Sequence, residues 1–162
     1  ALTVSGTILL MVKLSGENPL NVIYFNLIFG INIWLSSVAA HNLNFRNRTI
    51  LYWLMMFLGF ILLGASLDTS WRFAAYFLTY FGYWVLYHKY TVEIQTKSPK
   101  EVIGAIMAAR ALTMAITLSM GELLGGYLGR IIDVKMELGL RASVCLFVVL
   151  GIALFKPSRL KG

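Results

Sequence analysis

The chain has 162 residues, of which 59% are hydrophobic and 13% charged, and it carries a formal net charge of +7. Soluble domains carry about 25% charged residues, so this composition is typical of a membrane protein. The basic residues punctuate apolar runs, which excludes a nucleic-acid partner, and the single cysteine, Cys145, excludes an internal disulfide and a cysteine metal cluster.

Six apolar segments follow one another along the chain and predict membrane-spanning helices. Backbone polar groups must be hydrogen-bonded within lipid, so helices are the expected spanning elements. The sequence starts at Ala1, so either an initiator Met has been removed or the sequence is the tail of a longer chain. A span needs roughly 20 residues, and the shorter first segment favours the second alternative. The predicted fold is all-α: one domain, residues 1–162, of a polytopic membrane protein with six transmembrane helices at residues 1–14, 19–41, 49–67, 71–91, 101–132 and 139–155.

The two sides of the predicted membrane differ in charge. On one side the loops and helix ends carry eight Lys or Arg against two Asp or Glu, and on the other side five against four. Cytoplasmic loops carry the excess of basic residues. We therefore expect an integral protein of the cell membrane, inner or plasma, with both termini in the cytoplasm. The glycosylation sequon at Asn47 then lies in a cytoplasmic loop and is expected to be unmodified.

The second segment, residues 19–41, contains two asparagines and two serines within its apolar run. Asn26, Gly30 and Ser37 lie near one face of the predicted helix. Hydrogen bonds to neighbouring helices are one role for such residues, and each is worth about 0.6–2 kcal/mol.

The fourth segment, residues 71–91, is rich in aromatic residues at helical spacing. Aromatic side chains near its ends suit the membrane interfaces. Tyr80, Tyr83 and Trp84 lie deeper, and buried Tyr and Trp side chains usually need a hydrogen-bond partner. These residues either pack against neighbouring helices or line a ligand cavity.

The fifth segment, residues 101–132, combines a small-residue face with a polar face. Small residues at four-residue spacing let membrane helices approach closely. The predicted helix-packing residues are Gly121, Gly125, Gly126 and Gly129. Glu122 shares that face, whereas Arg110 lies on another side with Thr113 and Thr117. Charges within a membrane tend to face a bundle interior or a wet cavity, so Arg110 is a candidate for an anion contact or a cavity ion pair.

No catalytic or metal-binding pattern is present in the sequence: it has no Ser-His-Asp set, HExxH motif, phosphate-binding loop or paired carboxylates. We therefore predict no enzymatic activity, no metal site and no cofactor. A bis-histidine haem is a further alternative, because His41 and His88 both lie near the cytoplasmic ends of predicted helices.

Six spans, with a short basic loop after the second and a longer one between the fourth and fifth, resemble the C-terminal half of a major facilitator superfamily transporter. The stretch AAHNLNFRNRT resembles that family's basic loop motif, with Asn44, Arg46 and Arg48 at matching positions, although the acidic residue and both glycines of the motif are absent. Pro99 and Gly104 before the fifth helix, and the glycine-rich outer end of that helix, are also similar to the family.

The resemblance implies two inverted three-helix repeats, with substrate bound between two such halves. It also implies that the first, second, fourth and fifth helices line the cavity. The candidate substrate-path residues are Arg110, Thr113, Thr117, Asn26, Tyr80 and Trp84.

Two hypotheses for function follow. The first is a membrane transporter, or the C-terminal half of one, that moves a small solute by alternating access. The alternative is a transporter-like structural or accessory subunit that has lost transport and packs in a larger membrane protein complex. The expected partners are the lipid bilayer, a second six-helix half, a homodimer or other membrane subunits, and a small-molecule substrate.

Overall fold

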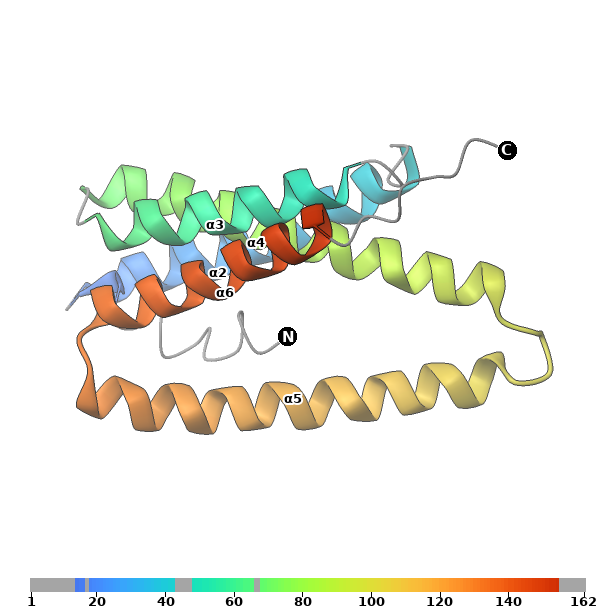
Figure 1. Ribbon diagram of the computed structural model, residues 1–162. Coiled ribbons are helices and arrows are strands. Elements are labelled where there is room, and N and C mark those ends of the chain that lie inside the picture. Colours follow the sequence, from blue (N-terminus) through green and yellow to red (C-terminus); the bar gives the residue numbers. More distant parts are fainter. Residues whose placement is uncertain (1–13, 17, 43–47, 66–67, 155–162) are drawn as a thin grey trace.

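The computed structural model describes residues 14–16, 18–42, 48–65 and 68–154, and these residues are almost entirely helical. Consecutive helices run antiparallel to each other (Figure 1). The helices are α2 (Pro19–Asn42), α3 (Thr49–Gly64), α4 (Thr69–Lys97), α5 (Ile103–Ile131) and α6 (Val134–Leu154).

Three of these helices are long and apolar enough to cross a membrane, over Pro19–His41, Ile103–Leu128 and Val134–Leu154, which is consistent with a membrane protein. The prediction of six transmembrane helices in half of a major-facilitator-type bundle is therefore wrong, because the described residues form five helices and three of them qualify. The first predicted span, residues 1–14, lies outside the described residues apart from Leu14.

The two helices that do not qualify differ from the prediction for different physical reasons. α3 has 16 residues and so extends about 24 Å, which is short of the roughly 30 Å hydrocarbon core. α4 has 29 residues, but its last turns are polar, with the sequence HKYTVEIQTK. The apolar runs in the sequence therefore locate these two helices correctly. They do not show whether each helix has the length and the uniform hydropathy of a membrane span.

The ends of α4 are fixed by local sequence signals. The carboxylate of its N-cap residue, Asp68, accepts a hydrogen bond from the backbone N–H of Trp71 at 3.2 Å, which satisfies a free donor of the first turn. Pro99 follows shortly after Lys97, and the residue before a proline disfavours helical geometry. α4 thus extends beyond both ends of the predicted segment 71–91.

α3 and α4 approach each other closely through two glycines. A Cβ atom at Gly59 would meet the backbone nitrogen of Thr79 at 2.9 Å and the carbonyl oxygen of Ala75 at 3.0 Å. A Cβ atom at Gly82 would meet the carbonyl oxygen of Tyr52 at 2.7 Å. Only glycine leaves room for the two backbones at these points, as expected for closely packed membrane helices.

The core lies between α2, α3, α4 and α6 and is rich in aromatic residues. Phe25 of α2 packs edge to face against Tyr76 of α4, with ring centroids 4.9 Å apart. Met56 and Phe60 of α3 and Cys145 of α6 are fully buried in the same cluster. These contacts join α2, α3, α4 and α6 into one bundle (Figure 1).

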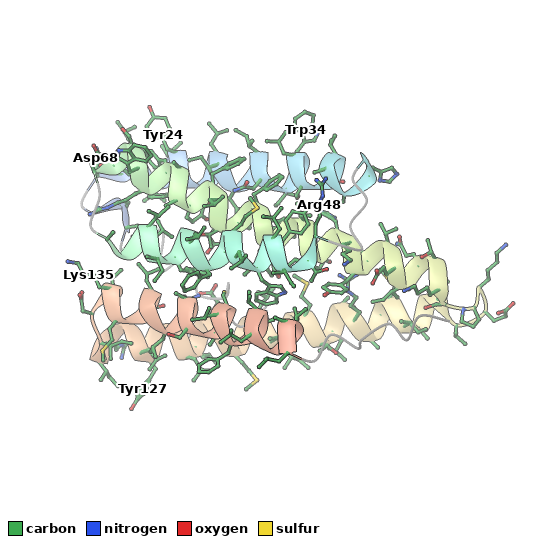
Figure 2. The ribbon with its side chains drawn as sticks, turned by 45° about the horizontal axis from the view of Figure 1, so that its top comes forward. Tyr24, Trp34, Arg48, Asp68, Tyr127 and Lys135 are labelled. Carbon is green, nitrogen blue, oxygen red and sulfur yellow. The ribbon has the colours of Figure 1, made fainter. Side chains whose placement is uncertain are left out.

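α5 lies to one side of this bundle (Figure 1), and its most apolar stretch contains no buried residue. Figure 2 shows Tyr127 of α5 pointing away from the other helices, and Tyr24 and Trp34 of α2 pointing outward on the opposite side. Trp34 and Tyr127 are 66% and 65% exposed. Exposed apolar faces of this kind suit contact with lipid.

α6 begins at Val134 instead of residue 139, which brings Lys135 and Glu137 into the same helix as Arg141. The Oε1 atom of Glu137 accepts a hydrogen bond from Nη2 of Arg141 at 2.7 Å, and both side chains are buried. The charge count predicted for the outer side of the membrane includes this pair. In the fold these two charges form an ion pair within the bundle.

Candidate binding site between α3, α4 and α5

A cavity of about 400 Å³ lies between α3, α4 and α5. Small-molecule sites commonly measure about 300–1,000 Å³, so this cavity can hold a ligand. α3 and α4 contribute an aromatic and apolar wall, and α5 contributes a wall with polar groups. The lining residues are Trp53, Met56, Tyr83, Leu86, Tyr87, Tyr90, Arg110, Thr113, Met114 and Thr117.

Helical periodicity places the lining side chains on one face of each helix. The three lining tyrosines of α4 recur at steps of four and three residues. In α5, Arg110, Thr113 and Thr117 recur at steps of three and four. Residues at these spacings are neighbours on a helix surface. The structure thus brings three of the predicted path residues together at one cavity.

Arg110 is held against α4 by two contacts with Tyr87. Its Nη2 donates a hydrogen bond to the backbone carbonyl oxygen of Tyr87 at 3.2 Å, and its guanidinium carbon lies 4.5 Å from the centre of the Tyr87 ring, a cation–π contact. The same carbonyl also accepts a hydrogen bond from Oγ1 of Thr91 at 2.7 Å. Nη1 of Arg110 is buried and has no hydrogen-bond partner. The guanidinium therefore has hydrogen-bonding capacity to spare.

No acidic residue is among the described residues that line the cavity, so the charge of Arg110 is unmatched there. A cation in an apolar wall is costly unless it is paired and hydrogen-bonded. The Tyr87 ring offsets only part of this cost, about 0.5–2 kcal/mol. An anionic group in the cavity would provide the missing partner, because a guanidinium presents five N–H donors in a planar arrangement that suits carboxylate and phosphate.

The other three predicted path residues are not among those that line the cavity. Asn26 is exposed on α2, where its Nδ2 donates a hydrogen bond to the carbonyl oxygen of Val22 at 3.0 Å. Tyr80 is fully buried in the core, and Trp84 packs against Phe29 of α2 with ring centroids 5.7 Å apart. Tyr80 and Trp84 therefore contribute to the contact between α2 and α4.

The contact between α2 and α4 contains several buried polar groups without hydrogen-bond partners. Asn32 is fully buried and both polar atoms of its amide are unpartnered, as are Nε1 of Trp84 and Nε2 of His88. His88 also makes a hydrogen bond with the backbone of Ile33. Each unsatisfied buried group costs about 1–3 kcal/mol, so this contact is less well satisfied than that between α3 and α4.

Trp53, Tyr87 and Tyr90 line the cavity but were not predicted as site residues. Tyr87 and Tyr90 carry a usable signal, because aromatic residues recur at helical spacing through this part of the sequence. Trp53 lies in an almost uniformly apolar helix, where hydrophobic periodicity does not distinguish a cavity-facing side chain from a core one.

A smaller cavity of about 210 Å³ lies between α5 and α6, and it is lined by Gly121, Leu124, Gly125, Leu128, Glu137, Leu140 and Arg141. Two of the predicted packing glycines, Gly121 and Gly125, are buried and border this cavity beside α6. A Cβ atom at Gly126 would meet no atom within 4 Å, and Gly129 lies in the last turns of the same helix. A helix-packing role for these glycines stays a prediction.

The loop-motif residues and the histidines do not come together at a site in the described parts of the chain. Asn44 and Arg46 lie outside the described residues, and Arg48 precedes α3 as an exposed residue whose side chain makes no capping hydrogen bond. His41 is exposed in the last turn of α2. His88 contacts the backbone of Ile33, about two turns before His41, so the two histidines lie at different levels along the bundle.

The described residues contain no group of three or more His, Cys, Asp or Glu side chains that could hold a metal ion. The resemblance to the major facilitator superfamily stays a prediction, and the chemistry of the α3–α4–α5 cavity is the observation that bears on function. No protein-family model, no curated protein and no solved structure matches this chain.

Proposed function

We propose that this chain forms a membrane transporter, or part of one, that binds a small anionic solute beside Arg110 and moves it across the membrane. The observation that carries the proposal is the Arg110 guanidinium at the wall of a cavity of about 400 Å³. One of its nitrogens is buried without a partner, and no acidic residue is among the described lining residues. An anionic solute supplies the charge that the cavity lacks.

Transport requires the site to open to one side of the membrane at a time. The cavity is suited to this because its walls belong to two different parts of the fold. α3 and α4 are packed tightly through Gly59 and Gly82, whereas α5 lies beside the bundle and is joined to its neighbours by short connections at residues 98–102 and 132–133. A displacement of α5 relative to α3 and α4 would open and close the cavity.

The proposal includes an orientation in the cell membrane, with both termini in the cytoplasm. The connection between α4 and α5 is flanked by Lys97 and Lys100, and the positive-inside rule assigns it to the cytoplasmic side. Arg110 lies about two turns into α5 from this connection. The anion would therefore bind nearer to the cytoplasmic surface.

The test is uptake of a panel of radiolabelled organic anions, with their neutral amides as comparison, into proteoliposomes that contain the full chain. Removing a hydrogen bond to a charged group costs about 1.5–3 kcal/mol, so Arg110→Ala should reduce uptake by at least about tenfold. Arg110→Lys should retain part of it, because the charge remains. Arg130→Ala is the matched control, since Arg130 is exposed in the last turn of α5.

Uptake in Arg110→Ala equal to that of the unmodified chain, with the protein inserted and folded, would remove Arg110 from the mechanism. If Arg130→Ala reduces uptake by the same factor, the loss of uptake follows from removing any positive charge from α5 and is not specific to Arg110. Loss in Arg110→Ala alone, restricted to anions, supports the proposal.

A second candidate function is a non-transporting subunit of a larger membrane complex, and one observation favours it. The most apolar stretch of α5 contains no buried residue, and a partner helix could cover it as well as lipid could. A cysteine at Leu123, which is 75% exposed, would crosslink to such a partner in native membranes. A specific crosslinked membrane protein, together with no anion uptake, would favour this candidate.

A further inference from the structure

The two walls of the α3–α4–α5 cavity offer different interactions. The wall formed by α3 and α4 presents aromatic rings, among them those of Trp53 and Tyr83. The polar lining groups of α5, Arg110, Thr113 and Thr117, form one row along that helix. A ligand that fits both walls has an apolar, ring-bearing face and one polar edge.

The two threonines offer hydrogen-bond acceptors to a ligand, whereas the arginine offers donors. Oγ1 of Thr113 donates to the carbonyl oxygen of Ala109 at 2.8 Å, and Oγ1 of Thr117 donates to the carbonyl oxygen of Thr113 at 2.7 Å. A hydroxyl whose proton is engaged by its own helix still has lone pairs that can accept a hydrogen bond. The guanidinium of Arg110 has no acceptor at all.

The hydrogen-bond donors of the cavity therefore lie at one end of this row and the acceptors lie toward the other. At a rise of 1.5 Å per residue, Thr113 lies roughly 5 Å and Thr117 roughly 10 Å along the helix axis from Arg110. A matching ligand carries its anionic group at one end, and at the other end a hydrogen-bond donor at about that separation.

We propose that the ligand of this cavity is an aromatic carboxylate with a hydrogen-bond donor at the end opposite its carboxylate, and that Thr113 and Thr117 select for that donor. The inference rests on the proposed function, in which Arg110 binds the anionic group. The aromatic ring of the ligand lies between the two ends and packs against the rings of Trp53 and Tyr83, since aromatic pairs favour offset or edge-to-face contact.

The test compares three probes that share a para-oxygenated phenylpropanoyl skeleton. Para-hydroxyphenylpropionate has the carboxylate and the donor. Para-methoxyphenylpropionate has the carboxylate, but its ether oxygen can only accept. Para-hydroxyphenylpropionamide has the donor but no charge. Binding of each probe to the full chain in lipid nanodiscs is measured by equilibrium dialysis.

We expect the hydroxy acid to bind about threefold to tenfold more tightly than the methoxy acid, the effect of one hydrogen bond. The amide should bind at least about tenfold more weakly than the hydroxy acid, because Arg110 then lacks its anionic partner. Tighter binding of the methoxy acid than of the hydroxy acid would overturn the inference.

The threonine variants assign the donor preference to named residues. Thr117→Val, alone or together with Thr113→Val, should remove the preference, and a helical circular dichroism spectrum equal to that of the unmodified chain shows that the variant is folded. Thr117→Ser should keep the preference. Thr96→Val is the matched control, because the Thr96 hydroxyl donates to the carbonyl oxygen of Val92 in the same manner but is exposed outside the cavity.

If a valine variant binds no probe, Thr117→Ser decides the question: loss of donor preference in this variant would overturn the inference, and its retention supports it. A preference that persists in the double valine variant would also overturn it.

Failure of the inference and failure of the proposed function give different results. Binding of both acids that depends on Arg110 but shows no donor preference overturns the inference alone. A donor preference that depends on the threonines, with no uptake of the hydroxy acid into proteoliposomes, supports the inference and removes transport. Absence of binding of every carboxylate overturns both.

Discussion

The contact between α3 and α4 and the surroundings of α5 use the same small residues in opposite ways. At Gly59 and Gly82 the missing side chain lets two backbones approach until no further atom fits. In α5, Gly126 has open space beside it, and Thr113 and Thr117 border a cavity. One region is closed and fixed by its packing, and the other leaves volume for a ligand and for movement. Small residues in a membrane helix therefore indicate close packing only where a second backbone is actually present.

The largest loss of stability is expected at the boundary between the two regions. There α6 packs on α3 and carries the buried pair of Glu137 and Arg141. Arg141→Met removes the cationic partner of the buried Glu137 carboxylate, so we expect a loss of about 3–5 kcal/mol in the free energy of unfolding. The measurement is reversible unfolding in mixed detergent and sodium dodecyl sulfate micelles. The double variant Glu137→Leu, Arg141→Met should recover most of this lost stability. If the double variant is as unstable as the single one, Glu137 and Arg141 stabilise the fold through contacts other than their ion pair.

Gly59→Ala disrupts the close contact between α3 and α4. The added Cβ meets the α4 backbone at Thr79, and overpacking of this kind costs about 1–3 kcal/mol or more. We expect a corresponding fall in the free energy of unfolding by the same method. A variant as stable as the unmodified chain would mean that α3 and α4 can separate without cost, and the distinction between the two regions would fail.

Tyr87→Leu probes the open region. It removes the ring beneath the Arg110 guanidinium but keeps the backbone carbonyl that accepts its hydrogen bond. Loss of a cation–π contact of about 0.5–1 kcal/mol should weaken binding of phenylpropionate about twofold to fivefold. Tyr87→Phe keeps the ring face and should bind as the unmodified chain does. Equal weakening in both variants would assign the effect to the hydroxyl group.

Gly126→Ala should have the smallest effect. Nothing lies within 4 Å of the added Cβ, and alanine is favoured over glycine within a helix by up to about 1 kcal/mol. We expect the free energy of unfolding to stay within about 0.5 kcal/mol of the unmodified value or to rise. A clear loss of stability would instead show that the packing role predicted for this glycine is real and that another helix covers it in the membrane.

Several features could be predicted from the sequence because they depend on neighbours within one segment. The extents of α2 and α5 follow from uncharged or nearly uncharged runs, and the grouping of Arg110 with Thr113 and Thr117 follows from helical spacing. Each of these signals comes from residues close together in the chain, and packing against other helices does not change it. The end of α4 at Lys97 was not predicted, because the predicted segment ended at residue 91, although Pro99 carries a signal for it.

The remaining features depend on which helix lies beside which, and no periodicity contains that information. Trp53 meets Arg110 across a cavity only because α3 and α5 flank α4. Glu137 was expected in a loop because charges usually end a span, but its partner Arg141 four residues later allows both to stay in the helix. The number of spans was overestimated for a similar reason, because an apolar run does not reveal the length of the helix that contains it.

The shortness of α3 has a consequence for the lipid around the protein. Arg48 precedes its first residue, Asp68 is the N-cap residue of α4, and both charged side chains are exposed (Figure 2). α3 has 16 residues and is about 24 Å long, which is several ångströms less than the roughly 30 Å hydrocarbon core of an average bilayer. Such hydrophobic mismatch costs a fraction of a kcal/mol per ångström. The protein should accordingly melt at a higher temperature in short-chain than in long-chain phosphatidylcholine vesicles, and membrane thickness becomes one of the conditions that govern where it resides.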